Sequence, residues 1–138
     1  MKVFVDTNVL LDVILARQPF VDHSRLVLEA GEQGKVQLYT SSLSLMNVHY
    51  IVESSRSKPV ARAAVMTLRS FIEVSAVDES TLDRALEIDS LDLEDAVQYF
   101  SQDRICDVII SRDKKGFREF KSTSLTPEEF LEKYAPSW

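Results

Sequence analysis

Cysteine is almost absent from this sequence, because Cys106 is the only one among 138 residues. A disulfide framework is therefore excluded, and the expected environment is the reducing cytoplasm. No apolar run approaches the ~20 residues that a membrane-spanning helix needs. The acid at Asp6 stands where a signal peptide would need apolar length. We expect a cytoplasmic protein without a membrane segment, with Cys106 buried or half-buried rather than catalytic.

Histidine is also scarce, and neither His23 nor His49 stands in a nucleophile motif, so we interpret both as structural or surface residues. Positive charge is in deficit, because 16 basic residues face 22 acidic ones. The net charge of −6 argues mildly against nucleic-acid binding, since phosphate contacts need basic surface. The objection weakens if acids gather in one site that a divalent cation neutralises. Two clusters of basic residues are interpreted as solvated faces: Arg56, Lys58, Arg62 and Arg69, and Arg112, Lys114, Lys115, Arg118 and Lys121.

The remaining composition is that of an ordinary globular protein, with 45% hydrophobic and 28% charged residues. A chain of 138 residues has room for one sizeable core. We find no internal repeat, no low-complexity stretch and no linker. The sequence therefore predicts a single domain over residues 1–138.

Strand-like and helix-like patterns alternate along the chain. Strands are predicted at residues 2–6, 36–40, 71–77, 107–111 and 122–124. Helices are predicted at 7–15, at 22–32 with Gly31 and Gly34 closing it, at 41–54, from Pro59, from Asp78, from Asp92 and at 127–134. Such alternation predicts an α/β fold, in which helices cover both faces of a parallel sheet.

Apolar residues at helical spacing indicate which side of each helix faces inward. The predicted inward stripes are Leu43, Met46, Asn47, Tyr50 and Ile51; Val60, Ala63, Ala64, Leu68 and Phe71; Leu82, Ala85 and Leu86; and Leu93, Ala96, Val97 and Phe100.

Two acids follow predicted strands, where the ligands of parallel sheets usually bind. Asp6 ends the first strand, and Asp113 lies two residues past Val108-Ile109-Ile110. We therefore expect both carboxylates at one edge of the sheet. Each acid could also simply cap the helix that follows it, because aspartate is favoured there. Position alone leaves both interpretations open.

Three motifs together are similar to those of the PIN domain family. Residues 5–12 (VDTNVLLD) resemble its opening motif, residues 94–100 (EDAVQYF) its central acidic helix start, and residues 108–113 (VIISRD) with Phe117 its final motif. Their order and spacing agree over essentially the whole chain, and the similar branch includes toxins of bacterial toxin–antitoxin pairs. The resemblance implies a PIN-like three-layer sandwich with a five-stranded parallel sheet, and cleavage of RNA at a Mg²⁺ or Mn²⁺ site.

The resemblance also implies roles for individual residues. Asp6, Asp95 and Asp113 would be catalytic metal ligands, with Glu94 as a fourth ligand and Asn8, Asn47 and Ser111 as supporting groups. Hard divalent cations prefer such oxygen ligands. Asp95 falls away from the apolar stripe of its helix, and Asp92 to Asp95 could be merely a capping box. The assignment of Asp95 therefore depends on the resemblance.

Two positions depart from the family pattern. Asn47 stands where many PIN domains carry a glutamate, and Gly116 stands where relatives often carry another acid. Because Asn47 lies within a predicted apolar stripe, we expect it to point inward and to need a polar partner. Both departures remove negative charge from the implied site, which puts full activity in question.

The resemblance implies three partners: an RNA substrate, an antitoxin protein and a second copy of the chain. The region of Met46, Tyr50, Val60 and Leu68 is the candidate dimer face, although core packing would also explain each residue. One alternative is a catalytically weak PIN-like module that binds RNA or an antitoxin. Another is an aspartyl-nucleophile phosphatase using Asp6. That class needs a second acid two residues later, where this chain has Asn8.

Overall fold

The computed structural model describes residues 1–89, 92–117, 120 and 122–138, and a five-stranded parallel sheet forms its centre. The strands follow one another in space in the order β3-β2-β1-β4-β5, and every neighbouring pair is parallel. Their bounds are β1 (Lys2–Val5), β2 (Gln37–Ser41), β3 (Ile72–Ser75), β4 (Val108–Ile110) and β5 (Thr123–Leu125). The predicted α/β fold is confirmed, and the central strands β1 and β4 end side by side.

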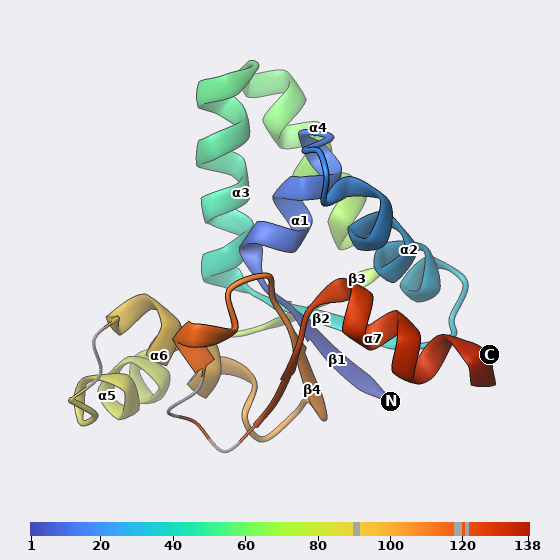
Figure 1. Ribbon diagram of the computed structural model, residues 1–138. Coiled ribbons are helices and arrows are strands. Elements are labelled where there is room, and N and C mark those ends of the chain that lie inside the picture. Colours follow the sequence, from blue (N-terminus) through green and yellow to red (C-terminus); the bar gives the residue numbers. More distant parts are fainter. Residues whose placement is uncertain (90–91, 118–119, 121) are drawn as a thin grey trace.

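Helices connect the strands and cover both faces of the sheet (Figure 1). They are α1 (Thr7–Ile14), α2 (Val21–Glu32), α3 (Ser42–Ser55), α4 (Lys58–Arg69), α5 (Glu79–Leu86), α6 (Leu93–Gln102) and α7 (Pro127–Tyr134), with short 3₁₀ turns η1 (Lys114–Phe117) and η2 (Ala135–Ser137). Figure 1 shows α3 and α4 as a hairpin that extends away from the sheet. Over the part of the chain that the structure describes, no helix is both long enough and apolar enough to cross a bilayer.

Side chains that accept hydrogen bonds at helix N-termini explain where several helices begin. Asp78 accepts from the backbone of Thr81, and Asp92 accepts from that of Asp95. Ser41 rather than Ser42 caps α3, through the backbone N–H of Ser44. Such caps satisfy backbone donors that a helix leaves unpaired. The starts predicted for these three helices are therefore confirmed.

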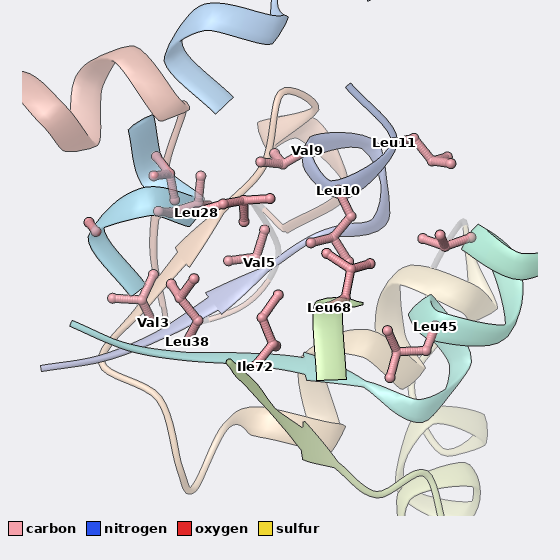
Figure 2. Close-up of a cluster of buried hydrophobic side chains, with 14 of the residues drawn as sticks. Val3, Val5, Val9, Leu10, Leu11, Leu28, Leu38, Leu45, Leu68 and Ile72 are labelled. Atoms are coloured by element: carbon pink, nitrogen blue, oxygen red, sulfur yellow. The ribbon is translucent and has the colours of Figure 1, made fainter. Parts of the chain in front are cut away.

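Alternation along the strands divides the core into two parts. Val3 and Val5 of β1 face the larger part, which also receives side chains from α1, α2, α3, α4 and α7 (Figure 2). Phe4 points the other way, onto Ile109 and Phe117, on the side where α5 and α6 pack. Period-two alternation requires this division. The sheet is thereby held between two layers of helices, as the three-layer prediction states.

The predicted inward face of α3 is wrong at Met46 and Tyr50, whereas Leu43 and Ile51 are partly buried against the core. Its buried residues are Ser44, Leu45, Val48 and Val52, whereas Met46 and Tyr50 are 64% and 72% exposed. The reason is that α3 packs chiefly against α4 and α1 rather than flat on the sheet. Apolar spacing identified a helix but not its packing partner.

Similar corrections apply to three other helices. In α4, Ala61 and Leu68 are buried and Val60 is exposed. In the predicted stripe of α5, Ala85 is buried, whereas Leu82 and Leu86 are exposed. In α6, Ala96 and Val97 are buried and Leu93 is exposed. Gly31 does not end α2 but lies within it, where a Cβ would meet Leu38 Cδ1 at 2.3 Å. That glycine allows α2 to approach β2 closely.

Candidate metal centre

Asp6 lies at the carboxyl end of β1 and also caps α1. Its Oδ1 accepts a hydrogen bond from the backbone N–H of Thr7 at 2.8 Å, and its Oδ2 accepts one from Ser111 Oγ at 2.8 Å. Burial raises the pKa of Asp6, hydrogen bonds from Ser111 and Thr7 oppose that shift, and the charges of Glu94 and Asp113 add to it. The two interpretations of Asp6 are therefore compatible, because one oxygen caps the helix while the carboxylate faces other acids.

The loop after β4 is fastened to α1 by a small polar network. Ser111 Oγ donates to Asp6 and accepts from the backbone N–H of Asp113 at 3.1 Å and from Asn8 Nδ2 at 3.4 Å. Asn8 Oδ1 accepts from the backbone N–H of Arg112 at 3.3 Å. Asn8 and Ser111 thus lie where a supporting role would require them. Asp113 itself is exposed, and its Oδ1 accepts from the backbone N–H of Lys115 at 3.2 Å.

The first turn of α6 brings two further acids to the same edge. Asp95 is partly buried, and its pKa is raised from 3.8 to about 6. Burial is the largest cause of this shift, and the negative charges of four nearby acids add to it: Asp92, Asp6, Asp113 and Glu94. Like charges raise the pKa of a carboxyl only when they lie close to it. The structure therefore brings together all four acids that the resemblance selects.

Asn47 reaches this group from α3. Its Nδ2 donates a hydrogen bond to Glu94 Oε1 at 2.8 Å. The amide is partly buried, and the polar partner that the sequence analysis expected is present. A neutral donor here stabilises the Glu94 carboxylate, whereas the negative charge of a glutamate at position 47 would oppose it. Where many PIN domains carry a glutamate on α3, this chain has Asn47, and its amide holds Glu94 of α6 by a hydrogen bond.

Gly116 lies directly against Asp95. A Cβ at position 116 would stand 2.3 Å from Asp95 Oδ2 and 2.7 Å from its Cγ, which no side chain tolerates without displacement. Any residue larger than glycine, including the acid of the family pattern, would therefore require Asp95 to move. Asp95 can occupy its present position only because residue 116 has no side chain.

These groups fit a hard divalent cation by their chemistry, because all of them are carboxylates or polar oxygens. Burial first, and then the charges of neighbouring acids, raises the pKa values of Asp6 and Asp95, so the charged form of each carboxyl is disfavoured. Within the described residues, however, no group of three or more histidine, cysteine, aspartate or glutamate side chains is arranged so that it could hold a metal ion. A cation among these carboxylates would offset their mutual repulsion.

Sequence reasoning missed a buried polar network behind the acids. Thr7 Oγ1 donates to Ser44 Oγ at 2.9 Å, Ser44 Oγ donates to Gln98 Oε1 at 3.1 Å, and Ser41 Oγ also donates to Gln98. This network joins α1, α3 and α6, the three helices that carry or support the acids. Polar residues within otherwise buried segments, such as Gln98 after Ala96 and Val97, were the available signal.

A second missed feature is the ion pair between Arg112 and Asp12. Asp12 is completely buried, and it accepts from Arg112 Nε at 2.6 Å and Nη2 at 3.0 Å. The interpretation of Arg112 as part of a solvated basic face is therefore wrong. Lys114 is also engaged, with Glu129 at 2.8 Å, while Arg118 and Lys121 lie outside the described residues. A buried carboxylate needs a paired cation, and this pair fixes the loop that follows β4.

Comparison with known proteins gives the family. The PIN domain model matches residues 2–115. The chain belongs to the PIN domain family. It is 30% identical to ribonuclease VapC1 of Aquifex aeolicus (strain VF5) over 139 residues, which covers 96% of this chain and 95% of that protein.

Solved structures share the PIN fold at lower identity. The toxin–antitoxin complex from Klebsiella pneumoniae gives a TM-score of 0.65 at 22% identity, covering 91% of this chain and 97% of the other. VapBC2 from Rickettsia felis, bound to a promoter DNA fragment, gives a TM-score of 0.68 at 14% identity, covering 91% of this chain and 98% of the other. VapC20 of Mycobacterium tuberculosis, a toxin that cleaves the sarcin–ricin loop, gives a TM-score of 0.66 at 15% identity, covering 83% of this chain and 92% of the other. The PIN-like fold expected from the motifs is thereby confirmed.

The contact between Gly116 and Asp95 gives a first prediction. Gly116→Ala should displace the Asp95 carboxylate and lower the affinity for Mn²⁺ by about 10-fold, as loss of groups that orient metal ligands does. Isothermal titration of the purified protein measures the affinity. Lys115→Ala is the matched control, because Lys115 is exposed and offers Asp113 only its backbone N–H. Unchanged Mn²⁺ affinity in Gly116→Ala would contradict the role assigned to Gly116.

Proposed function

We propose that this protein is a metal-dependent endoribonuclease and the toxin of a toxin–antitoxin pair. The observation that carries the proposal is the gathering of Asp6, Glu94, Asp95 and Asp113 at the carboxyl edge of a PIN fold. The similarity to a ribonuclease over nearly the whole chain supports the same activity. Single-stranded or structured RNA is the proposed substrate.

In this proposal Asp6, Asp95 and Asp113 hold Mg²⁺ or Mn²⁺, and Glu94 is a fourth ligand. The cation supplies water activation and neutralises charge that develops on the phosphate. Ser111 and Asn8 keep Asp6 and the Asp113 loop in place through the hydrogen bonds described above. Asn47 keeps Glu94 directed at the group. Four carboxylates would repel an RNA phosphate without a cation, so activity should require one.

The alternative is a PIN module that binds RNA or an antitoxin but cleaves weakly. The neutral residues at positions 47 and 116 motivate it. Two contacts argue for the enzyme instead: Asn47 donates to Glu94 rather than leaving it unsupported, and Gly116 makes room for Asp95. Asn47 and Gly116 are therefore both compatible with the cluster of four acids.

The second prediction concerns cleavage. Asp6→Asn should lower Mg²⁺- or Mn²⁺-dependent cleavage of single-stranded RNA by at least about 100-fold, the scale for one group that stabilises transition-state charge. The fold should survive, because asparagine can still accept from Thr7 and donate to Ser111. Since burial raises the pKa of Asp6, a neutral side chain should melt at the same or a higher temperature.

Asp22→Asn is the control for this assay, because Asp22 is an exposed acid on α2. Clean wild-type protein that cleaves no RNA at any cation concentration would favour the binding module. Cleavage that persists in Asp6→Asn would place the active site elsewhere.

We also propose that the chain pairs with a second copy and with an antitoxin. The solved relatives include toxin–antitoxin complexes, which supports the antitoxin. Met46, Tyr50 and Val60 are 64%, 72% and 47% exposed, so a second copy that covered them would remove apolar surface from water. Leu68, at 1% exposed, belongs to the core and is withdrawn from the candidate dimer face.

The third prediction follows from these exposures. Wild-type protein at tens of micromolar should sediment as a dimer, and Met46→Glu with Tyr50→Glu should convert it to a monomer, because charge is depleted from interface cores. The double variant should keep the wild-type circular-dichroism spectrum, because both residues are exposed, and should melt at a lower temperature only by the amount that dimerisation contributes. A wild-type protein that sediments as a monomer would refute the homodimer.

A further inference from the structure

A cavity of about 580 Å³ opens beside the loop that follows β4. Arg112 lines it and lies in the chain between Ser111 and Asp113, so the cavity and the acidic edge share the loop that follows β4, and none of the acids lines the cavity. The start of α2 and the start of α7 form its other walls. Its lining residues are Pro19, Phe20, His23, Ser24, Arg112, Thr126, Pro127 and Glu128.

One wall of this cavity is a platform formed by Arg112 and Phe20. The Arg112 guanidinium lies 3.9 Å from the centroid of the Phe20 ring. Its Nε and Nη2 both donate to the fully buried Asp12, which also accepts from Ser24 Oγ at 3.3 Å. The guanidinium therefore has little freedom to turn. Phe20 nevertheless remains 40% exposed, so part of the ring is available to a ligand.

The charge of the cavity selects the kind of ligand. Arg112 is neutralised by Asp12, and Glu128 adds a negative charge at the wall, so the site does not suit a phosphate. A planar, uncharged ring suits it better, because unpaired nucleobases stack on aromatic side chains and on guanidinium planes. Glu128 offers a carboxylate acceptor for a base amino or imino group.

We propose that this cavity, named here the Phe20 pocket, binds an unpaired nucleobase of the RNA close to the phosphate that is cleaved. The proposal rests on the proposed ribonuclease function and adds a base-binding subsite to it. Stacking there would draw single-stranded RNA across the β4 loop and place a neighbouring phosphate at the acids. RNA whose bases remain paired would lack this contact.

The test measures the affinity of the inactive Asp6→Asn protein for a fluorescent single-stranded RNA of about 12 nucleotides in the presence of Mg²⁺. Adding Phe20→Leu, which keeps apolar bulk but removes the ring, should weaken binding about 5- to 100-fold, the range for one lost base–aromatic stack. Phe20→Trp should retain the affinity. Trp138→Leu is the matched control, because Trp138 is an equally exposed aromatic residue, at 40%, and contacts Lys35 and Phe130 instead.

An abasic scan of the same RNA makes the test specific. One abasic position should weaken binding as much as Phe20→Leu does, and the two changes together should add little, as expected for groups that contact each other. Equal affinity of Phe20→Leu and its parent would overturn the pocket assignment, as would an equal loss in Trp138→Leu. A Phe20→Leu variant that loses only a protein partner would assign the cavity to that partner and overturn the base site.

Failure of the pocket and failure of the ribonuclease are distinguishable, provided that RNA cleavage by the wild-type protein in Mg²⁺ is measured first. If the wild type cleaves and Phe20→Leu, introduced into the active protein, cleaves with unchanged KM, only the pocket is wrong. A raised KM in Phe20→Leu supports the base site in the active enzyme. If the wild type neither cleaves nor binds RNA, the proposed function itself is wrong, and the pocket with it.

Discussion

The gathering of partly buried carboxylates at the carboxyl edge of the sheet is the constraint on which the functional part of this structure depends. Burial raises the pKa values of both Asp6 and Asp95, and the charges of Glu94 and Asp113 add to it, so keeping these ionised acids together lowers the stability of the fold. Parallel strands bring the ends of β1 and β4 to one edge, and the polar contacts of Ser111 hold them there. Such uncompensated charge is typical of functional sites.

The residues around the acids make this repulsion tolerable. Asn47 gives Glu94 a neutral donor, and Gly116 leaves space for Asp95. The ion pair between Arg112 and the buried Asp12 fixes the β4 loop without reducing the charge of the acids, because Asp12 already balances the guanidinium. The same pair stiffens the platform of the Phe20 pocket. The proposed metal site and the proposed base site therefore share one loop.

The sequence alone predicted what depends on local pattern and on topology. Alternating strands and helices, the caps Asp78 and Asp92, and the meeting of Asp6 with Asp113 all follow from short segments and the geometry of parallel sheets. The contacts of Asn47 with Glu94 and of Gly116 with Asp95 join residues distant in sequence, so no periodicity contains them. The inward face of α3 was mispredicted because spacing shows that a helix is amphipathic but not which neighbour it meets.

The most direct test of this account is the pKa of the Asp95 carboxyl, measured by NMR titration with and without Mg²⁺. Without the cation the pKa should be about 6, above the ordinary 3.8, so the folded state holds this proton more tightly than the unfolded state and stability should fall as pH rises between those values. With Mg²⁺ the pKa should drop, because a bound cation favours the charged carboxylate. A pKa near 3.8 without Mg²⁺, or one that Mg²⁺ leaves unchanged, would contradict a cation site built on these acids.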